Sequence, residues 1–133
     1  MRYLLDTNIC IYFLKGQFNL IDTFASKGLD KFAISEITYA ELVYGAEKSQ
    51  NIEKNLLVVE NFIKSIPILP IFPGLKIYAK EKARLRNLGL PISDFDVLIA
   101  STAIYNDMVL ITRNIKEFER IQNLKYENWI DEN

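Results

Sequence analysis

The sequence predicts an α/β domain with a largely parallel sheet that helices cover on both faces. Short apolar segments that suit buried strands alternate with longer segments whose apolar residues recur at helical spacing. This alternation favours parallel strands that are joined by helical crossovers. The 133 residues, half of them hydrophobic, suit a single domain over residues 1–133 that is large enough to bury a core.

The N-terminal quarter is predicted to hold two strands and two helices. A short buried strand over 2–5 leads into a helix over 8–14, which Gly16 ends. Apolar residues within 18–24 indicate a second short helix. A turn then precedes the second strand, over 32–34.

The middle of the chain is predicted to hold two helices and an edge strand. Residues 37–46 and 52–63 place apolar side chains at helical spacing. Residues 66–71 have the composition of a strand, but their prolines confine it to the edge of a sheet. Pro73 and Gly74 mark the turn that follows.

The last part of the chain continues the alternation. A helix over 75–88 is closed by Gly89, and the most apolar helix follows over 95–105. Strands are predicted over 108–111 and 124–126.

The composition limits the chemistry that the chain can perform. It has no histidine and one cysteine, which argues against the usual zinc sites and against catalytic triads that need an imidazole. Carboxylates, amides and hydroxyls remain, and these hard oxygen ligands suit Mg²⁺ or Mn²⁺. The formal charge of -1 lacks the strong basicity of many nucleic-acid binders. The first residues contain no apolar run that fits a signal peptide or a membrane span, so we expect a cytoplasmic protein without a membrane partner.

Four polar residues, Asp6, Glu41, Asp96 and Asn114, adjoin predicted strands and helices that can bring them together. Asp6 directly follows one strand, Asn114 closely follows another, and Glu41 lies one turn into the helix after a third. Sites in parallel α/β sheets form outside the carboxyl ends of the strands, so we expect these residues at one edge. Asp96 lies on the same side of its helix as the buried apolar residues, which is unusual for a carboxylate.

Helix capping is a simpler explanation for three of these four residues. Capping does not explain Asp6, nor why three acids should share one edge of the sheet. Clustered carboxylates raise one another's pKa and are tolerated mainly when a cation neutralises them. The pairs with the spacing of a capping box are Thr38 with Glu41, Ser93 with Asp96, and Asn114 with Glu117.

Four blocks of sequence carry a family resemblance that spans nearly the whole chain. They are LLDTNI at 4–9, ISEITYAELVYGA at 34–46, DVLIA at 96–100, and LITRN at 110–114 with Glu117-Phe118 shortly after it. In order and spacing they resemble PIN-domain ribonucleases of the VapC toxin type. The resemblance implies a three-layer α/β/α domain and an endoribonuclease that uses Mg²⁺ or Mn²⁺ on single-stranded RNA. It also implies a cognate antitoxin protein and a homodimer.

The resemblance assigns roles to particular residues. Asp6, Glu41 and Asp96 match the family's acidic metal ligands, and Asn114 matches a fourth position at which it would orient a water or a ligand. Metal-bound water supplies the nucleophile, so no histidine base is needed. Thr7 and Thr112 are candidates to hydrogen-bond an acid, a phosphate or a water, although both residues also suit a turn or a cap.

Other charged residues have two readings each. Asp94 is either an outer acid of the metal site or a charge that the N-terminus of its helix favours, and we prefer the second. Lys76, Lys80 and Arg84 recur every four residues on one helix and, with Arg113, could contact RNA phosphates. A charged helix face is as often simply solvated.

Two other classes of function compete with the nuclease. A receiver domain or an aspartyl-phosphate phosphatase also carries acids at strand ends, but the first needs an acidic pair after its first strand and the second an acid at position 8, which is Asn. A non-catalytic interaction module would have no reason to keep mutually repelling acids. Large apolar residues, among them Tyr12, Phe13, Phe18 and Phe62, either complete the core or seat an antitoxin helix or a second protomer.

Overall fold

A parallel five-stranded sheet forms the centre of the molecule, in the order β3-β2-β1-β4-β5. The computed structural model describes residues 2–131. The predicted α/β class is confirmed, and the central strand β1 pairs with β2 on one side and β4 on the other. The strands are β1 (Tyr3–Leu5), β2 (Phe32–Ser35), β3 (Ile68–Leu69), β4 (Val109–Ile111) and β5 (Lys125–Glu127).

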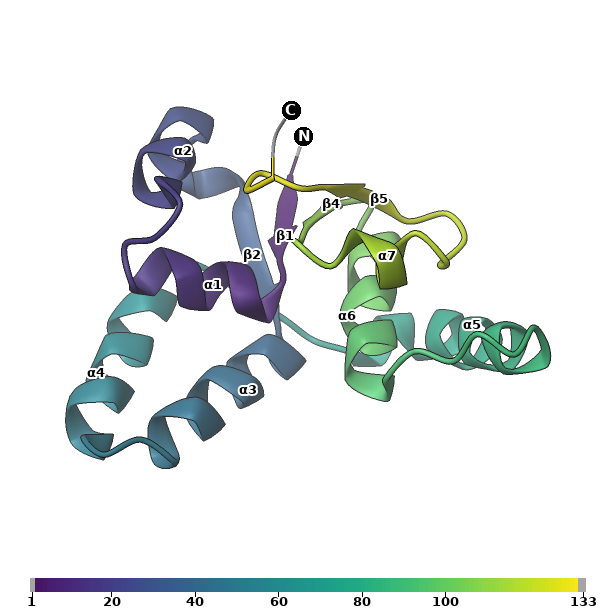
Figure 1. The fold of residues 1–133 in the computed structure, drawn as a ribbon, viewed down its shortest axis with the longest axis horizontal. Helices are drawn as coiled ribbons and strands as arrows, with labels where there is room; N and C mark the ends of the chain where they lie inside the picture. Colours follow the sequence, from purple (N-terminus) through teal and green to yellow (C-terminus); the bar gives the residue numbers. More distant parts are fainter. Residues whose placement is uncertain (1, 132–133) are drawn as a thin grey trace.

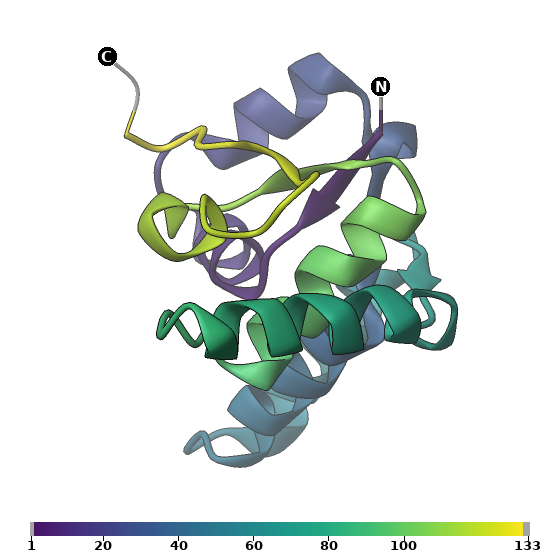
Figure 2. The same ribbon diagram turned by 90° about the vertical axis from the view of Figure 1, so that its right-hand side faces the viewer.

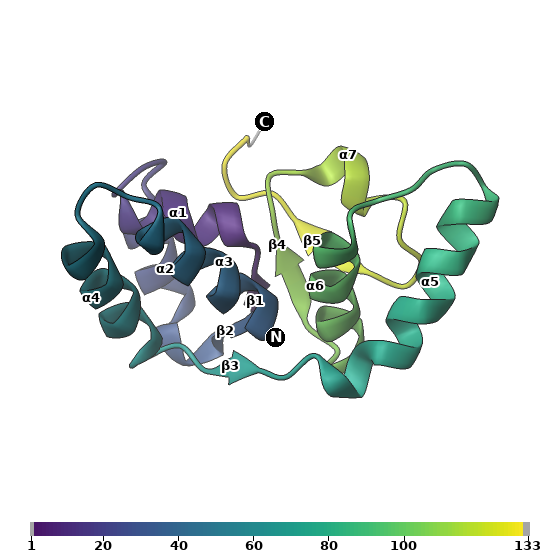
Figure 3. The ribbon, with the colours of Figure 1, turned by 90° about the horizontal axis from the view of Figure 1, so that it is seen from below.

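Helices flank the sheet on both sides (Figure 1). Seen from below, α1, α2 and α4 lie to one side and α5, α6 and α7 to the other (Figure 3). In Figure 2, α5 in dark green crosses in front of α6 in light green, and the two helices are in contact. The helices are α1 (Thr7–Leu14), α2 (Leu20–Lys27), α3 (Glu36–Glu47), α4 (Ile52–Ile63), α5 (Leu75–Asn87), α6 (Asp94–Tyr105) and α7 (Ile115–Phe118), with short 3-10 turns at Leu29–Lys31 and Phe72–Gly74.

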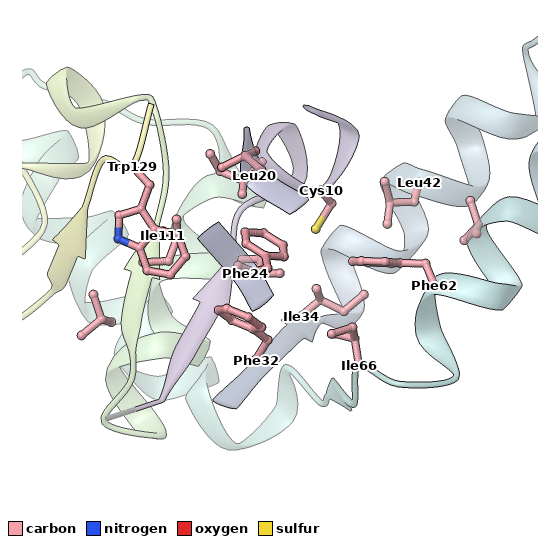
Figure 4. Packing of buried hydrophobic residues seen from close by; sticks show 14 of the residues in the cluster. Cys10, Leu20, Phe24, Phe32, Ile34, Leu42, Phe62, Ile66, Ile111 and Trp129 are labelled. Atoms are coloured by element: carbon pink, nitrogen blue, oxygen red, sulfur yellow. The ribbon is translucent and has the colours of Figure 1, made fainter. Parts of the chain in front are cut away.

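Two hydrophobic clusters, one on each face of the sheet, hold the three layers together. Successive strand residues point to opposite faces, so Leu5 joins one cluster and Leu4 the other, and both are fully buried. Figure 4 shows the first cluster, in which Phe24 and Phe32 pack together with ring centroids 4.7 Å apart. The second cluster contains Leu110 with side chains of α5, α6 and α7.

The structure differs from the predicted elements at several places. The second helix, predicted over 18–24, spans Leu20–Lys27, because Phe18 and Asn19 have a left-handed backbone. The edge strand over 66–71 shrinks to β3, because Pro67 and Pro70 on either side have no N–H to donate. The carbonyl of Pro67 still accepts a hydrogen bond from the backbone N–H of Ile34. The short helix α7 was not predicted, since one turn of helix leaves almost no periodic signal.

The carboxyl ends of β1, β2 and β4 lie together at one edge of the sheet. The chain enters α1 from β1 and α3 from β2 there, and enters α7 shortly after β4. Leu5 lies opposite Ile111 in the parallel pairing of β1 with β4, so the two segments that follow these residues start side by side. Because it carries the residues that were predicted to form the active site, this edge is named the catalytic edge. Within residues 2–131, no helix has the length and apolar character to cross a membrane.

Candidate active site

Asp6 is a buried carboxylate fixed by the sheet itself. Its backbone N–H donates to the carbonyl of Ile111 at 2.9 Å, which extends the β1–β4 pairing by one residue. Its Oδ1 accepts from the backbone N–H of Thr7 at 2.9 Å, and its Oδ2 accepts from the Thr112 hydroxyl at 2.8 Å. Asp6 is thus the N-cap of α1, a role that the sequence did not indicate for it.

The pKa of Asp6 is raised to about 6. Burial is the largest cause, since a charged carboxylate loses its hydration in the interior. The hydrogen bonds from Thr112 and Thr7 favour the charged form, while the charges of Asp96 and Glu41 oppose it. The predicted convergence of Asp6, Glu41 and Asp96 is therefore visible as mutual repulsion.

Glu41 reaches the catalytic edge from α3 and is tied to α1 through Thr7. The Thr7 hydroxyl donates to Glu41 Oε1 at 2.6 Å and also lies 3.1 Å from the hydroxyl of Thr38. A hydroxyl carries one proton, so the Thr38 hydroxyl must be the donor in the second contact. The cap of α3 is Ser35, whose hydroxyl accepts from the N–H groups of the next turn, so Thr38 and Glu41 do not form a capping box.

Asp96 lies in the first turn of α6 and is half-buried. Burial raises its pKa, Ser93 lowers it, and the charges of Glu117 and Glu41 raise it further. The Ser93 hydroxyl accepts from the backbone N–H of Asp96 at 3.3 Å, so Ser93 is the cap of α6. Because Ser93 caps the helix, the carboxylate of Asp96 remains available at the catalytic edge.

Glu117 is a fourth carboxylate close to the site, and sequence reasoning missed it as a functional residue. Its charge acts on Asp96 from α7. Its spacing from Asn114 had suggested a capping box, yet Asn114 makes no side-chain cap bond to α7. Its position in the sequence could have indicated this role, because Glu117 belongs to the same block as Asn114 and lies one helical turn further along the chain.

Thr112 links Asn114 to the acids. The Thr112 hydroxyl donates to Asp6 and accepts from the backbone N–H of Asn114 at 3.0 Å. Asn114 is only partly exposed and stands at the start of α7. A single threonine hydroxyl therefore joins the backbone of Asn114 to the carboxylate of Asp6.

The charges at this edge suit an oxygen-liganded divalent cation. In the part of the chain that the structure describes, no Lys or Arg forms an ion pair with Asp6, Glu41 or Asp96. Also within residues 2–131, no three acids stand close enough to bind one ion together. Mg²⁺ commonly uses only one or two carboxylates and completes its shell with water and substrate oxygens, so the donor set fits this ion.

The outlying charges are mostly engaged elsewhere. Asp94 is exposed and pairs with Lys82 at 2.8 Å and with the Tyr78 hydroxyl at 2.9 Å. Arg84 donates two hydrogen bonds, of 3.0 and 2.7 Å, to the buried Glu81, and it also donates one to the carbonyl of Arg120. These contacts are structural, whereas Lys76 and Lys80 are exposed on α5.

Sequence comparison assigns the family. The profile of the PIN domain matches residues 3–124, a range that contains Asp6, Glu41, Asp96, Asn114 and Glu117. The tRNA(fMet)-specific endonuclease VapC of Shigella flexneri is 36% identical over 130 residues, which cover 97% of this chain and 98% of that relative. Ribonuclease VapC1 of Haemophilus influenzae strain R2866 is 40% identical over 134 residues, with the same two coverages. The chain is a PIN-domain protein of the VapC family.

Solved structures agree with this assignment. The VapC-family chain matches DNA-bound VapBC from Salmonella typhimurium with a TM-score of 0.91 at 36% identity, covering 97% of this chain and 98% of that one. It matches VapBC2 from Rickettsia felis bound to a promoter DNA fragment with a TM-score of 0.86 at 39% identity, covering 97% and 99%. The predicted PIN-like α/β/α fold is confirmed.

Proposed function

We propose that the chain is the toxin of a toxin–antitoxin pair and a Mg²⁺- or Mn²⁺-dependent endoribonuclease. One observation carries the metal dependence: buried Asp6, with a pKa of about 6, lies within the field of Asp96 and Glu41. Such repulsion is costly unless a cation offsets it. The family relationship to named ribonucleases supports RNA as the substrate.

Asp6 and Asp96 would hold the metal, with Glu41 as a ligand through a water molecule. When bound, the ion supplies a water of lowered pKa and neutralises charge on the scissile phosphate. Each oxygen of Asp6 accepts one hydrogen bond, from Thr7 or from Thr112, and a carboxylate oxygen can take two. The second acceptor position of each oxygen is thus left for a ligand.

Other residues of the chain orient these ligands. Thr7 fixes the rotamer of Glu41, and Thr112 fixes both Asp6 and the backbone of Asn114. The Asn114 amide can donate to a phosphate oxygen or to a water beside Asp6. Preorganised donors of this kind favour developing charge without reorganisation at the moment of reaction.

Substrate contacts follow from the exposed cations. Lys76, Lys80 and Arg113 are the residues we propose for phosphate contacts. We propose initiator tRNA as the first RNA to test, because the Shigella relative is named for tRNA(fMet).

An antitoxin and a second protomer are the proposed protein partners. A groove of about 530 Å³ runs between α1, α3 and α4 and is lined by apolar residues that include Leu14 and Val58, and by Glu41. A partner segment in this groove would reach the catalytic edge directly. Relatives solved as VapBC complexes support this partner class.

Cleavage of purified tRNA tests the proposed function. The purified chain is incubated with tRNA(fMet) and total RNA, with Mg²⁺ or Mn²⁺, and beside an EDTA control. We expect discrete fragments that disappear with EDTA and in the Asp6→Asn variant. Asp22→Asn, which changes an exposed acid of α2, is the matched control and should cleave normally. Fragments that persist in EDTA, or in folded Asp6→Asn, would reject the metal–carboxylate mechanism.

A further inference from the structure

An exposed aromatic residue lies in the loop between α1 and α2, next to the catalytic edge. Phe18 is 45% exposed, and its backbone is left-handed with φ of 57°, as is that of Asn19 with φ of 56°. This conformation is costly for a bulky residue and persists only where neighbouring contacts hold it. The contacts are the edge of the Tyr12 ring at 4.9 Å between centroids and the guanidinium carbon of Arg113 at 5.0 Å from the Phe18 centroid.

Arg113 is held over these rings by Asp131. Its Nε donates to Asp131 Oδ2 at 3.0 Å and its Nη2 to Oδ1 at 3.3 Å. Asn128 positions that carboxylate, since its Nδ2 donates to Oδ2 at 3.1 Å and its Oδ1 accepts from the Asp131 N–H at 3.1 Å. Both members of the ion pair are about half exposed, with side-chain exposures of 41% and 51%, so water and salt weaken it.

The aromatic and cationic group sits beside the proposed catalytic residues. Arg113 directly follows Thr112, which hydrogen-bonds Asp6. Tyr12 is on the helix that Asp6 caps, about 9 Å further along its axis at a rise of about 1.5 Å per residue. A nucleotide near the one that is cut could therefore reach Phe18.

We propose that Phe18, Tyr12 and Arg113 form a stacking site for an unpaired RNA base, and that Asp131 is a latch which RNA displaces from Arg113. This inference rests on the proposed ribonuclease function. Unstacked bases bind to aromatic rings and to guanidinium planes, and such contacts need no particular sequence. Arg113 then serves twice, as part of the stacking surface and as a phosphate contact.

The charge distribution favours RNA over a protein as the occupant. The acids of the catalytic edge repel a phosphate backbone, and Arg113 is a cation whose backbone directly follows Thr112, the residue that hydrogen-bonds Asp6. A residue that attracts the strand to this edge is needed if the strand is to be cut there. Arg113 becomes free to attract the strand only after Asp131 has moved away from it.

The test measures binding of a fluorescent single-stranded RNA of mixed sequence to the full chain in the Asp6→Asn background, which does not cleave. Phe18→Leu should weaken binding between about 5-fold and about 150-fold, the range expected when one base no longer stacks on a ring. Phe18→Tyr should retain the affinity. Phe72→Leu is the matched control, because Phe72 is 79% exposed and lies in another part of the fold.

Abasic substitutions identify the stacked base. Replacing single nucleotides of the RNA by abasic sites should reveal one position at which the parent and Phe18→Leu bind equally. If folded Phe18→Leu bound the RNA with unchanged affinity, the stacking site would be overturned. Weaker binding of an antitoxin by this variant would not change that conclusion. Failure of the ribonuclease proposal looks different, since the unmodified chain would then cleave no RNA at all.

The latch has a test of its own in the same assay. Asp131→Asn should bind the RNA more tightly and should lose that gain when Arg113 is changed to Gln. Asp107→Asn is the control, because Asp107 is also an exposed acid in an ion pair, with Lys125 at 3.0 Å. Equal gains in Asp131→Asn and Asp107→Asn would mean a general charge effect and would reject the latch.

Discussion

The hydroxyl of Thr112 donates a 2.8 Å hydrogen bond to Oδ2 of Asp6 across 106 positions of sequence. The same hydroxyl oxygen accepts from the backbone N–H of Asn114. One threonine therefore favours the charged form of the buried acid and also holds the start of the segment that follows β4.

Thr112→Val should shift the acid limb of the pH–activity profile to higher pH. The hydrogen bond from Thr112 lowers the pKa of Asp6 below the value that burial alone would give, and valine cannot donate it. Loss of a hydrogen bond to a charged group of this kind should reduce activity near pH 6 about tenfold. Thr102→Val, a buried hydroxyl that bonds within α6, is the control. An unmoved acid limb would contradict this role.

The metal-free chain should lose stability as the pH rises from about 4 to about 6. The pKa of Asp6 is raised from 3.8 to about 6, so the unfolded chain ionises first and is favoured over this window. The loss is complete above the folded pKa and amounts to at most about 3 kcal/mol. Urea unfolding in EDTA measures it. In Asp6→Asn the slope should be shallower and the stability at neutral pH higher; an unchanged slope would be inconsistent with the raised pKa.

Asp96→Asn and Ser93→Ala should have opposite effects. Asp96 is repelled by Glu117 and Glu41, so its neutral variant should be as stable as the parent or more stable without metal, and inactive. Ser93 caps α6, and its loss should cost about 0.5–2 kcal/mol while much of the activity remains. Thermal melts in EDTA and RNA cleavage separate the two. A destabilised but active Asp96→Asn would show that Asp96 only shapes the helix.

Glu117→Gln should raise the Mg²⁺ concentration that cleavage requires. The charge of Glu117 raises the pKa of Asp96, so the variant should lower that pKa and reduce the negative field that attracts the cation. We expect half-maximal activity to need about tenfold more Mg²⁺, the order of effect that outer partners of metal ligands have. Glu119→Gln, an exposed neighbour, should titrate like the parent. Identical Mg²⁺ titrations of both variants would remove Glu117 from the site.

The cations of α5 should have different roles, with Arg84 contributing to stability and Lys76 and Lys80 to RNA binding. Arg84→Gln should lower the melting temperature, because it leaves the buried Glu81 without its partner. Lys76→Gln with Lys80→Gln should leave the melting temperature unchanged, lower RNA affinity and flatten its salt dependence, by about 0.7 in slope for each phosphate that the variant no longer neutralises. An unchanged salt slope would make these lysines a solvated face.

The hydrophobic pattern of the sequence was enough to predict where the acids lie. Each acid adjoins an apolar segment that is buried in the core. Leu4 and Leu5 direct Asp6 to the edge of the sheet, and Ile99 and Ala100 turn Asp96 toward it. The role of Glu117 was not predicted, because α7 has a single turn. In so short a helix, sequence spacing does not distinguish an acid of a capping box from an acid of a functional site. The spacing of Glu81 and Arg84 on one helix allows their ion pair, but the sequence did not show that both also bond the segment around Arg120, which gives Arg84 a structural role.

The aromatic residues show the same limit. Phe13 and Phe62 joined the core, where Phe13 stacks on Phe24 at 4.5 Å between centroids. Phe18 stayed at the surface, because the left-handed backbone of its loop turns it away from that cluster. Composition cannot separate these three phenylalanines, since the difference lies in one turn of the main chain.

The order of strands in the sheet bears on when the catalytic edge can assemble during synthesis of the chain. β1 leaves the ribosome well before its partner β4, and the threonine that holds Asp6 follows that residue by 106 positions. Loop closure over such a separation must come before the pairing that rewards it. A translation product that stops before β4 lacks a pairing partner of β1 and the threonine that holds Asp6, so it cannot assemble the proposed metal site.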